Sequence, residues 1–144
     1  KSRGIEIIES FFDKALATIL PKADLIIGNN VLAHVPNIRD FVAGVRIVLK
    51  KDGIANFEFP HILNLIKYNQ FDSIYHEHFY YYSLHSVMDL FKRENLYIYD
   101  VDILKTHGGS LRIYASKNKN KPSKNITKLC LFCYNFCHWH THWL

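Results

Sequence analysis

Cysteine is absent from the first 129 residues of this 144-residue chain, and all three cysteines, Cys130, Cys133 and Cys137, fall near its end. This distribution excludes a disulfide framework in the main body and predicts a reducing, cytoplasmic location. No run of about 18 apolar residues occurs, so we expect no transmembrane helix and no membrane partner. The first residues also lack the apolar centre of a secretory signal.

Acidic residues are absent after Asp102. Up to that position 11 Lys and Arg stand against 13 Asp and Glu, whereas residues 103–144 carry seven Lys and Arg. The formal net charge of +5 is therefore a property of the C-terminal segment, and we expect no nucleic-acid partner. Lys, Asn, Pro and Ser dominate from Lys117 to Lys128, which predicts a linker followed by a disordered tail over residues 117–144.

Alternating strand and helix patterns over residues 1–116 predict one α/β domain. A buried strand at 23–28, a helix capped by Asn37 and a second strand at 54–59 imply a parallel pair with a helical crossover. Lys50-Lys51-Asp52-Gly53 is expected to close that helix. Further helices are predicted at 13–20, at 62–68 and from Ser83 to about 95, and strands 96–104 and 110–115 are expected to pair antiparallel.

Polar side chains follow both predicted parallel strands. Asn29, Asn30 and His34 come after the first strand, and Glu58, Pro60 and His61 end the second. Because ligands of open α/β sheets bind beyond the carboxyl ends of the strands, we expect these groups to converge on one crevice. A histidine at a helix entry that bonds to the backbone is the structural alternative for His34.

Tyr75-His76-Glu77-His78 places titratable groups within an aromatic stretch. If the segment is extended, Tyr75 and Glu77 share one face and His76 and His78 the other. A neighbouring carboxylate raises the basicity of a histidine and apolar surroundings lower it, a balance that suits a general base near neutral pH. Zinc binding by the His-x-His pair and a surface loop of hydrogen-bonded histidines are the alternatives.

A glycine turn and a Cys/His tail are two further candidates. Gly108 and Gly109 permit close approach of a ligand or a plain hairpin turn, and Arg112 could hold a phosphate or face solvent. The tail Cys130-x-x-Cys133-x-x-x-Cys137-His138-x-His140-x-His142 has zinc-binding residue types, but its ligands are too crowded for the usual spacing. A non-catalytic metal-binding or scaffold module built on this tail is the alternative function.

The ordered set of motifs resembles one enzyme family. Residues 23–36 are similar to the fourth-strand motif of S-adenosylmethionine (SAM)-dependent C-methyltransferases that act on nucleotide-linked keto sugars. Residues 52–60 resemble the next strand, 75–83 the active-site segment and 107–112 the late glycine turn. The resemblance runs from about residue 4 to 116 and implies a partial Rossmann-like sheet, with parallel strands and an antiparallel pair at its C-terminal end.

This resemblance implies a reaction and roles for particular residues. A proton leaves the carbon beside a ketone, and the resulting enolate attacks the sulfonium methyl group of SAM. The implied general base is His78, with Glu77 and Tyr75 as its supporting neighbours and His34 as a second active-site histidine. Asn29 and Asn30 are implied to line the SAM pocket. The implied substrate-binding residues are His107, Gly108, Gly109, Ser110 and Arg112.

Several parts of that family have no counterpart in this sequence. They are the zinc-binding N-terminal domain, the glycine-rich SAM loop, the acidic residue that holds the ribose, and the C-terminal domain. The sequence is therefore interpreted as a segment cut at both ends, with residues 1–116 matching the catalytic domain. We expect SAM as cofactor, no metal in this segment and a nucleoside-diphosphate sugar as partner. Hydride chemistry on the same plan is disfavoured, because the dinucleotide glycine fingerprint is absent.

Overall fold

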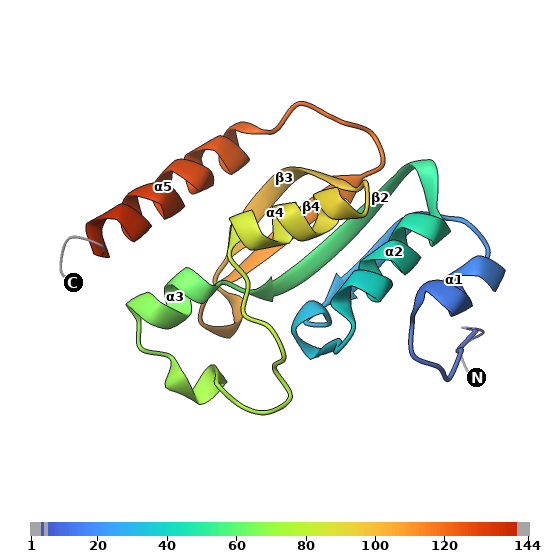
Figure 1. The fold of residues 1–144 in the computed structure, drawn as a ribbon, viewed down its shortest axis with the longest axis horizontal. Coiled ribbons are helices and arrows are strands. Elements are labelled where there is room, and N and C mark those ends of the chain that lie inside the picture. Colours follow the sequence, from blue (N-terminus) through green and yellow to red (C-terminus); the bar gives the residue numbers. More distant parts are fainter. Residues whose placement is uncertain (1–3, 5, 141–144) are drawn as a thin grey trace.

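A mixed sheet forms the centre of the molecule in the computed structural model, which describes residue 4 and residues 6–140. Four strands lie within this range, β1 (Ala23–Asn29), β2 (Leu49–Pro60), β3 (Tyr97–Leu104) and β4 (Ser110–Ser116). Their order is β1-β2-β4-β3, with β1 and β2 parallel and β4 antiparallel to both of its neighbours (Figure 1). The predicted α/β class and the antiparallel pair at the C-terminal end are confirmed.

Helices cover one face of this sheet. α2 (Ile38–Val48) makes the crossover from β1 to β2, and α4 (Leu84–Arg93) precedes β3 (Figure 1). α1 (Lys14–Ile19) packs on α2, and α3 (Ile62–Lys67) follows β2. Phe57 of β2 points into the core, where its ring meets Phe41 of α2 and Phe91 of α4 at centroid distances of 5.9 and 5.7 Å. Burial of these rings fixes which face of β2 the helices cover.

The helix starts follow from local capping chemistry. The Asn37 side chain accepts a hydrogen bond from the Asp40 amide, and Ser83 forms a reciprocal capping box with Ser86. Asp13 caps α1 by accepting from the amide of Leu16 at 2.7 Å. Such caps satisfy amides that lack a partner in the first turn, and each stabilises a helix by about 1 kcal/mol. The predicted caps at Asn37 and Ser83 are confirmed.

The predicted end of the second helix is wrong. α2 ends at Val48 and β2 begins at Leu49, so residues 50–53 belong to the strand rather than to a helix closure. Leu49 already pairs with Ala23 of β1, and Lys50 Nζ lies 2.7 Å from Asp24 Oδ2. A Cβ atom at Gly53 would come within 2.9 Å of the Ala23 carbonyl oxygen, so glycine here permits close approach of the strands.

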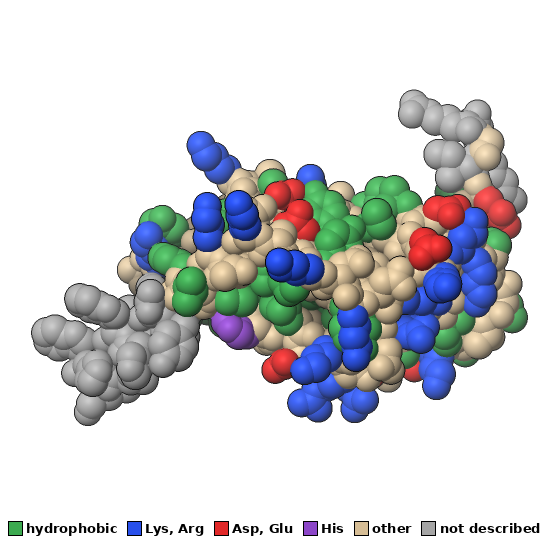
Figure 2. Space-filling view, turned by 90° about the horizontal axis from the view of Figure 1, so that it is seen from above, with side chains coloured by type: hydrophobic (Ala, Val, Ile, Leu, Met, Phe, Trp, Pro, Cys, Tyr) green, Lys and Arg blue, Asp and Glu red, His purple; other side chains and the backbone are tan. Residues whose placement is uncertain are grey.

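The C-terminal segment also differs from the expectation of disorder. Lys124–His140 form helix α5, which packs against β3 and α4. Ile126, Leu129 and Cys133 are spaced by three and four residues and are buried against the core. The described residues 117–123 lie outside helices and strands. On the face shown in Figure 2, Lys and Arg side chains occur in separate groups with acidic and apolar side chains between them.

Candidate active site

A pocket of about 320 Å³ lies where β1 and β2 end. Asn30 and His34 enter it from the segment after β1, and Pro60 closes it at the end of β2. Tyr75 and His78 come from the segment that precedes α4. The structure therefore brings together four of the site residues predicted from the sequence, namely Asn30, His34, Tyr75 and His78. The lining residues are Asn30, Ala33, His34, Pro60, Asp72, Ser73, Tyr75 and His78.

A left-handed residue turns the chain out of β1 and into the pocket. Asn30 has φ +53°, a conformation that asparagine tolerates better than most side chains. Its backbone N–H donates to the Glu58 carbonyl at 2.8 Å, which ties the end of β1 to β2. The short helix Leu32–His34 follows and presents His34 at the pocket. This is the strand-end placement that the topology predicts.

The segment around Tyr75 and His78 is a turn, so the extended arrangement considered for it is wrong. The His78 N–H donates to the Tyr75 carbonyl at 3.0 Å, a contact that closes a four-residue turn. Tyr75 and His78 therefore lie on the same side, with ring centroids 4.2 Å apart. His76 and Glu77, at the corner of the turn, are exposed to solvent.

Hydrogen bonds fix the tautomer of the neutral His78 ring. Its Nδ1 lies 2.9 Å from the Ser73 carbonyl oxygen, which can only accept, so Nδ1 carries the proton. Nε2 then carries the lone pair, and the Tyr75 hydroxyl donates to it at 3.0 Å. The Ser73 carbonyl behind the imidazole orients the ring. His78 is thus arranged to accept a proton at Nε2, directly or through the Tyr75 hydroxyl.

His34 lies beside His78, with ring centroids 4.7 Å apart and ring planes tilted by 57°. Its Nδ1 donates to the Glu77 carbonyl at 3.1 Å, so Nε2 carries the lone pair in its neutral form as well. The structural alternative for His34, a hydrogen bond to the backbone, is thus observed at one nitrogen, while the ring still lines the pocket. The contribution of Glu77 here is its carbonyl group. Its carboxylate lies 4.0 Å from His76 Nε2, and no hydrogen bond among the described residues joins it to His78.

Asn29 and Arg112 lie apart from this pocket, in a groove on the uncovered face of the sheet. Arg112 is paired there, because its Nη2 donates to Glu58 Oε2 at 2.8 Å, and this bond raises the pKa of the guanidinium. The Thr106 hydroxyl donates to the other oxygen of the same carboxylate at 2.9 Å. This role of Glu58 was not predicted from the sequence. The pattern that could have indicated it is a single acidic residue between two aromatic residues, Phe57 and Phe59. The proposed phosphate contact of Arg112 would therefore compete with Glu58.

The glycine turn packs against α3 and the residues that follow this helix instead of lining the candidate active-site pocket. Gly108 and Gly109 have φ values of +73° and +112°, and Gln70 Nε2 donates to the Gly108 carbonyl at 2.9 Å. The Ser110 hydroxyl donates to the Thr106 carbonyl at 3.2 Å. The His107 side chain lies outside the described part of the structure. A substrate-binding role for residues 107–110 stays a prediction.

Among the described side chains, no group of three His, Cys, Asp or Glu residues is placed so that it could hold a metal ion. The described part of the Cys/His tail therefore forms no metal centre. Cys133 is buried and Cys130 is half-buried on α5. The side chains of Cys137, His138 and His140, and the whole of His142, lie outside the description. No helix in residues 6–140 has the length and hydropathy that a membrane span requires.

The sheet order, the helical crossover and a pocket at the strand ends define a Rossmann-like α/β domain. A family profile described as "Methyltransferase domain" matches residues 4–101. The chain therefore belongs to the methyltransferase domain family. It is 39% identical over 118 residues to the "C-methyltransferase NovU" of Streptomyces niveus, covering 79% of this chain and 28% of that protein.

Solved structures show the same fold at low sequence identity. Magnesium protoporphyrin IX methyltransferase (ChlM) from Synechocystis PCC 6803, with bound SAH, matches with a TM-score of 0.56 and 15% identity. That match covers 72% of this chain and 48% of ChlM. A putative methyltransferase in complex with the Haloferax volcanii Trm112 activator gives a TM-score of 0.58 and 10% identity. Here 74% of this chain and 60% of the other are covered. The chain thus spans only part of each relative.

Proposed function

We propose that this domain contributes to SAM-dependent methyl transfer to a carbon beside a ketone, with His78 as the general base. The observation that carries the proposal is the His78 hydrogen-bond pattern, in which Ser73 holds Nδ1–H and leaves Nε2 as the basic nitrogen. The pocket position at the strand ends and the relative named as a C-methyltransferase support it.

In the proposed step one proton moves from the substrate to the protein. The hydrogen bonds of His78 and His34 determine which ring nitrogen can accept or donate it. The C–H bond beside the ketone breaks and its proton moves to His78 Nε2, and the electron pair remains as an enolate. The imidazolium that forms stays bonded to Ser73 and stabilises the enolate charge. The Tyr75 hydroxyl, which donates to Nε2 at rest, can pass the proton or turn toward the substrate. His34 can donate from Nε2 only when protonated, since its Nδ1–H is held by Glu77.

Asn30 is the described residue that fits a contact to SAM. It lies at the end of β1, lines the pocket and has its backbone fixed by the Glu58 carbonyl. When bound, SAM supplies the electrophilic methyl group for the new C–C bond. Asn29 lines the groove on the uncovered face. It is proposed as a second contact on the resemblance alone.

The proposed substrate is a nucleoside-diphosphate sugar with a ketone. Resemblance to nucleotide-sugar C-methyltransferases supports this class, and His107, Gly108, Gly109, Ser110 and Arg112 are its proposed contacts. Loss of the Glu58 bond would free Arg112 for a phosphate. A reducing, cytoplasmic setting belongs to the same proposal, supported by the absence of cysteine before position 130.

Exchange of the acidic proton tests the base without requiring methyl transfer. The full chain is incubated with a thymidine-diphosphate 4-keto sugar in D₂O, and deuterium at the carbon beside the ketone is followed by mass spectrometry. His78→Ala should slow enzyme-dependent exchange by about 100-fold or more, the usual contribution of a positioned base. His76→Ala is the matched control, because this neighbouring histidine side chain is 91% exposed. Undiminished exchange in His78→Ala would place the base elsewhere.

A further inference from the structure

A second cavity lies on the helical side of the sheet, between α5, α3 and β3. Its volume is about 520 Å³, larger than the candidate active-site pocket, and the two share no lining residue. Pro60 lines the active-site pocket and the next residue, His61, lines this cavity, so the two hollows flank the end of one strand. The expectation that His61 joins His34 in one crevice is therefore wrong.

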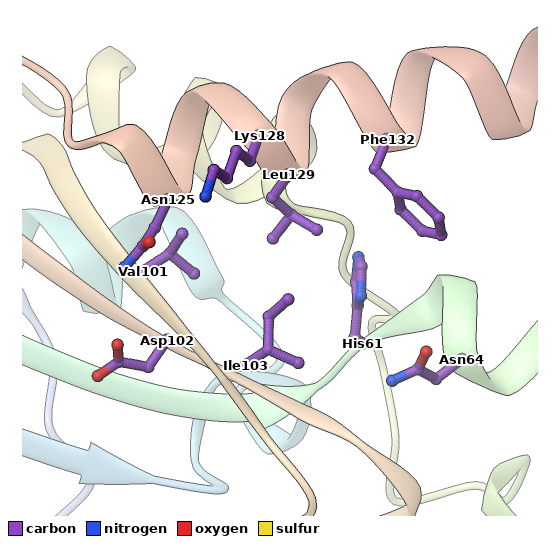
Figure 3. Close-up of a pocket in the computed structure, with 9 residues that line it drawn as sticks. All are labelled: His61, Asn64, Val101, Asp102, Ile103, Asn125, Lys128, Leu129 and Phe132. Atoms are coloured by element: carbon purple, nitrogen blue, oxygen red, sulfur yellow. The ribbon is translucent and has the colours of Figure 1, made fainter.

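His61 brings an unsatisfied polar atom to this cavity. The residue is only 3% exposed, and its Nε2 has no hydrogen-bond partner among the described residues. Figure 3 shows the ring pointing from the end of β2 toward α5, with Phe132 reaching down to it and Asn64 beside it. A buried polar atom without a partner is uncommon in folded proteins, and the ring that carries this atom lines the cavity.

The other walls define what the cavity accepts. Phe132 and Ile103 line it with side chains that are 50% and 65% exposed, so a ligand would cover apolar surface now in contact with water. Lys128 and Asp102 lie at the far end (Figure 3) and carry opposite charges, which favours a ligand without net charge. Burial lowers the pKa of His61 to about 4, so its ring is neutral at physiological pH.

We propose that this cavity is a binding site for a neutral aromatic molecule that bears a hydroxyl group. The ring would lie against Phe132 and Ile103, and the hydroxyl would bond to His61 Nε2. The hydroxyl would donate to Nε2, which carries the lone pair when Nδ1 holds the proton, and an ether oxygen cannot make this bond. The site is separate from the proposed methyl-transfer centre and does not depend on that activity.

The test uses 2-naphthol, a neutral aromatic alcohol near pH 7, and 2-methoxynaphthalene, which keeps the rings but cannot donate. The full chain is labelled with ¹⁵N-histidine, and the imidazole nitrogens are followed by NMR during titration. We expect 2-naphthol to shift Nε2 of His61 in a saturable way and to leave the exposed His85 unchanged. The methoxy compound should bind about fivefold more weakly, the usual effect of one hydrogen bond.

Two variants on α5 form a matched pair. Phe132→Ala should weaken 2-naphthol binding at least fivefold, whereas Leu131→Ala, whose parent side chain is 59% exposed and outside the cavity, should not change it. His61→Phe should remove the preference for 2-naphthol over the methoxy compound. Absence of a His61 shift at millimolar 2-naphthol would overturn the proposal. Equal affinity of wild type for the two compounds would do so as well, and this comparison needs no variant to fold.

Discussion

Acid should destabilise this domain through His61. Burial lowers the pKa of its ring from 6.5 to about 4 in the folded protein, whereas the unfolded chain keeps the ordinary value. Between these two values the unfolded state binds more protons than the folded state, so the free energy of unfolding falls as pH is lowered through this window. From pH 7 to pH 5 the two values give a loss of about 2 kcal/mol, with about 1 kcal/mol more by pH 4.

Urea denaturation at pH 7, 6 and 5 measures this loss. His61→Phe keeps an aromatic ring at the site and removes the titrating nitrogens, so its free energy of unfolding should fall by about 2 kcal/mol less than that of wild type. His76→Phe is the control, because the His76 side chain is 91% exposed. This replacement should leave the pH dependence of wild type intact. Parallel pH profiles for wild type and His61→Phe would refute the reasoning. So would a ¹⁵N titration midpoint of His61 near 6.5 in the folded chain.

Three further substitutions test the fold around the site, each by urea denaturation. Gly109→Ala should cost about 1–3 kcal/mol, because φ is +112° and the added Cβ would meet Asn64; an unchanged midpoint would contradict this geometry. Arg112→Met should lower the free energy of unfolding by removing the cation that faces the buried Glu58 carboxylate, and adding Glu58→Gln should recover part of the loss. Leu129→Ala should cost about 2–4 kcal/mol if α5 packs on the core, whereas Leu131→Ala should stay within about 0.5 kcal/mol.

Local signals were sufficient to predict most of the sheet and its crossover helix. The apolar run before Asn29, the cap at Asn37 and the periodic apolar residues of α2 each act over a few positions, so sequence alone reveals them. Helix α5 was missed because the Lys- and Asn-rich composition continues to Lys128 and so includes Ile126, the first of the buried residues Ile126, Leu129 and Cys133. Their spacing has meaning only once β3 supplies a surface to pack on.

Pairings between distant residues could not be predicted in this way. Glu58 and Arg112 are 54 positions apart and meet because β2 and β4 align them as direct cross-strand partners. That register depends on the whole sheet and not on either segment. The direction of His61 was equally open, since a residue just after a strand can turn to either face. The sequence therefore indicated which chemical groups crowd the strand ends, but not which pocket each one enters.

The turn at residues 75–78 explains how a crowded polar segment yields one distinct histidine. In an extended chain His76 and His78 would share a face and have similar surroundings. The turn instead leaves His76 in solvent and brings His78 between the Ser73 carbonyl and the Tyr75 hydroxyl. Those two contacts assign one nitrogen as donor and the other as acceptor, which composition cannot do. The backbone of this turn therefore gives His78 the contacts of a base, whereas the Glu77 carboxylate lies beside His76.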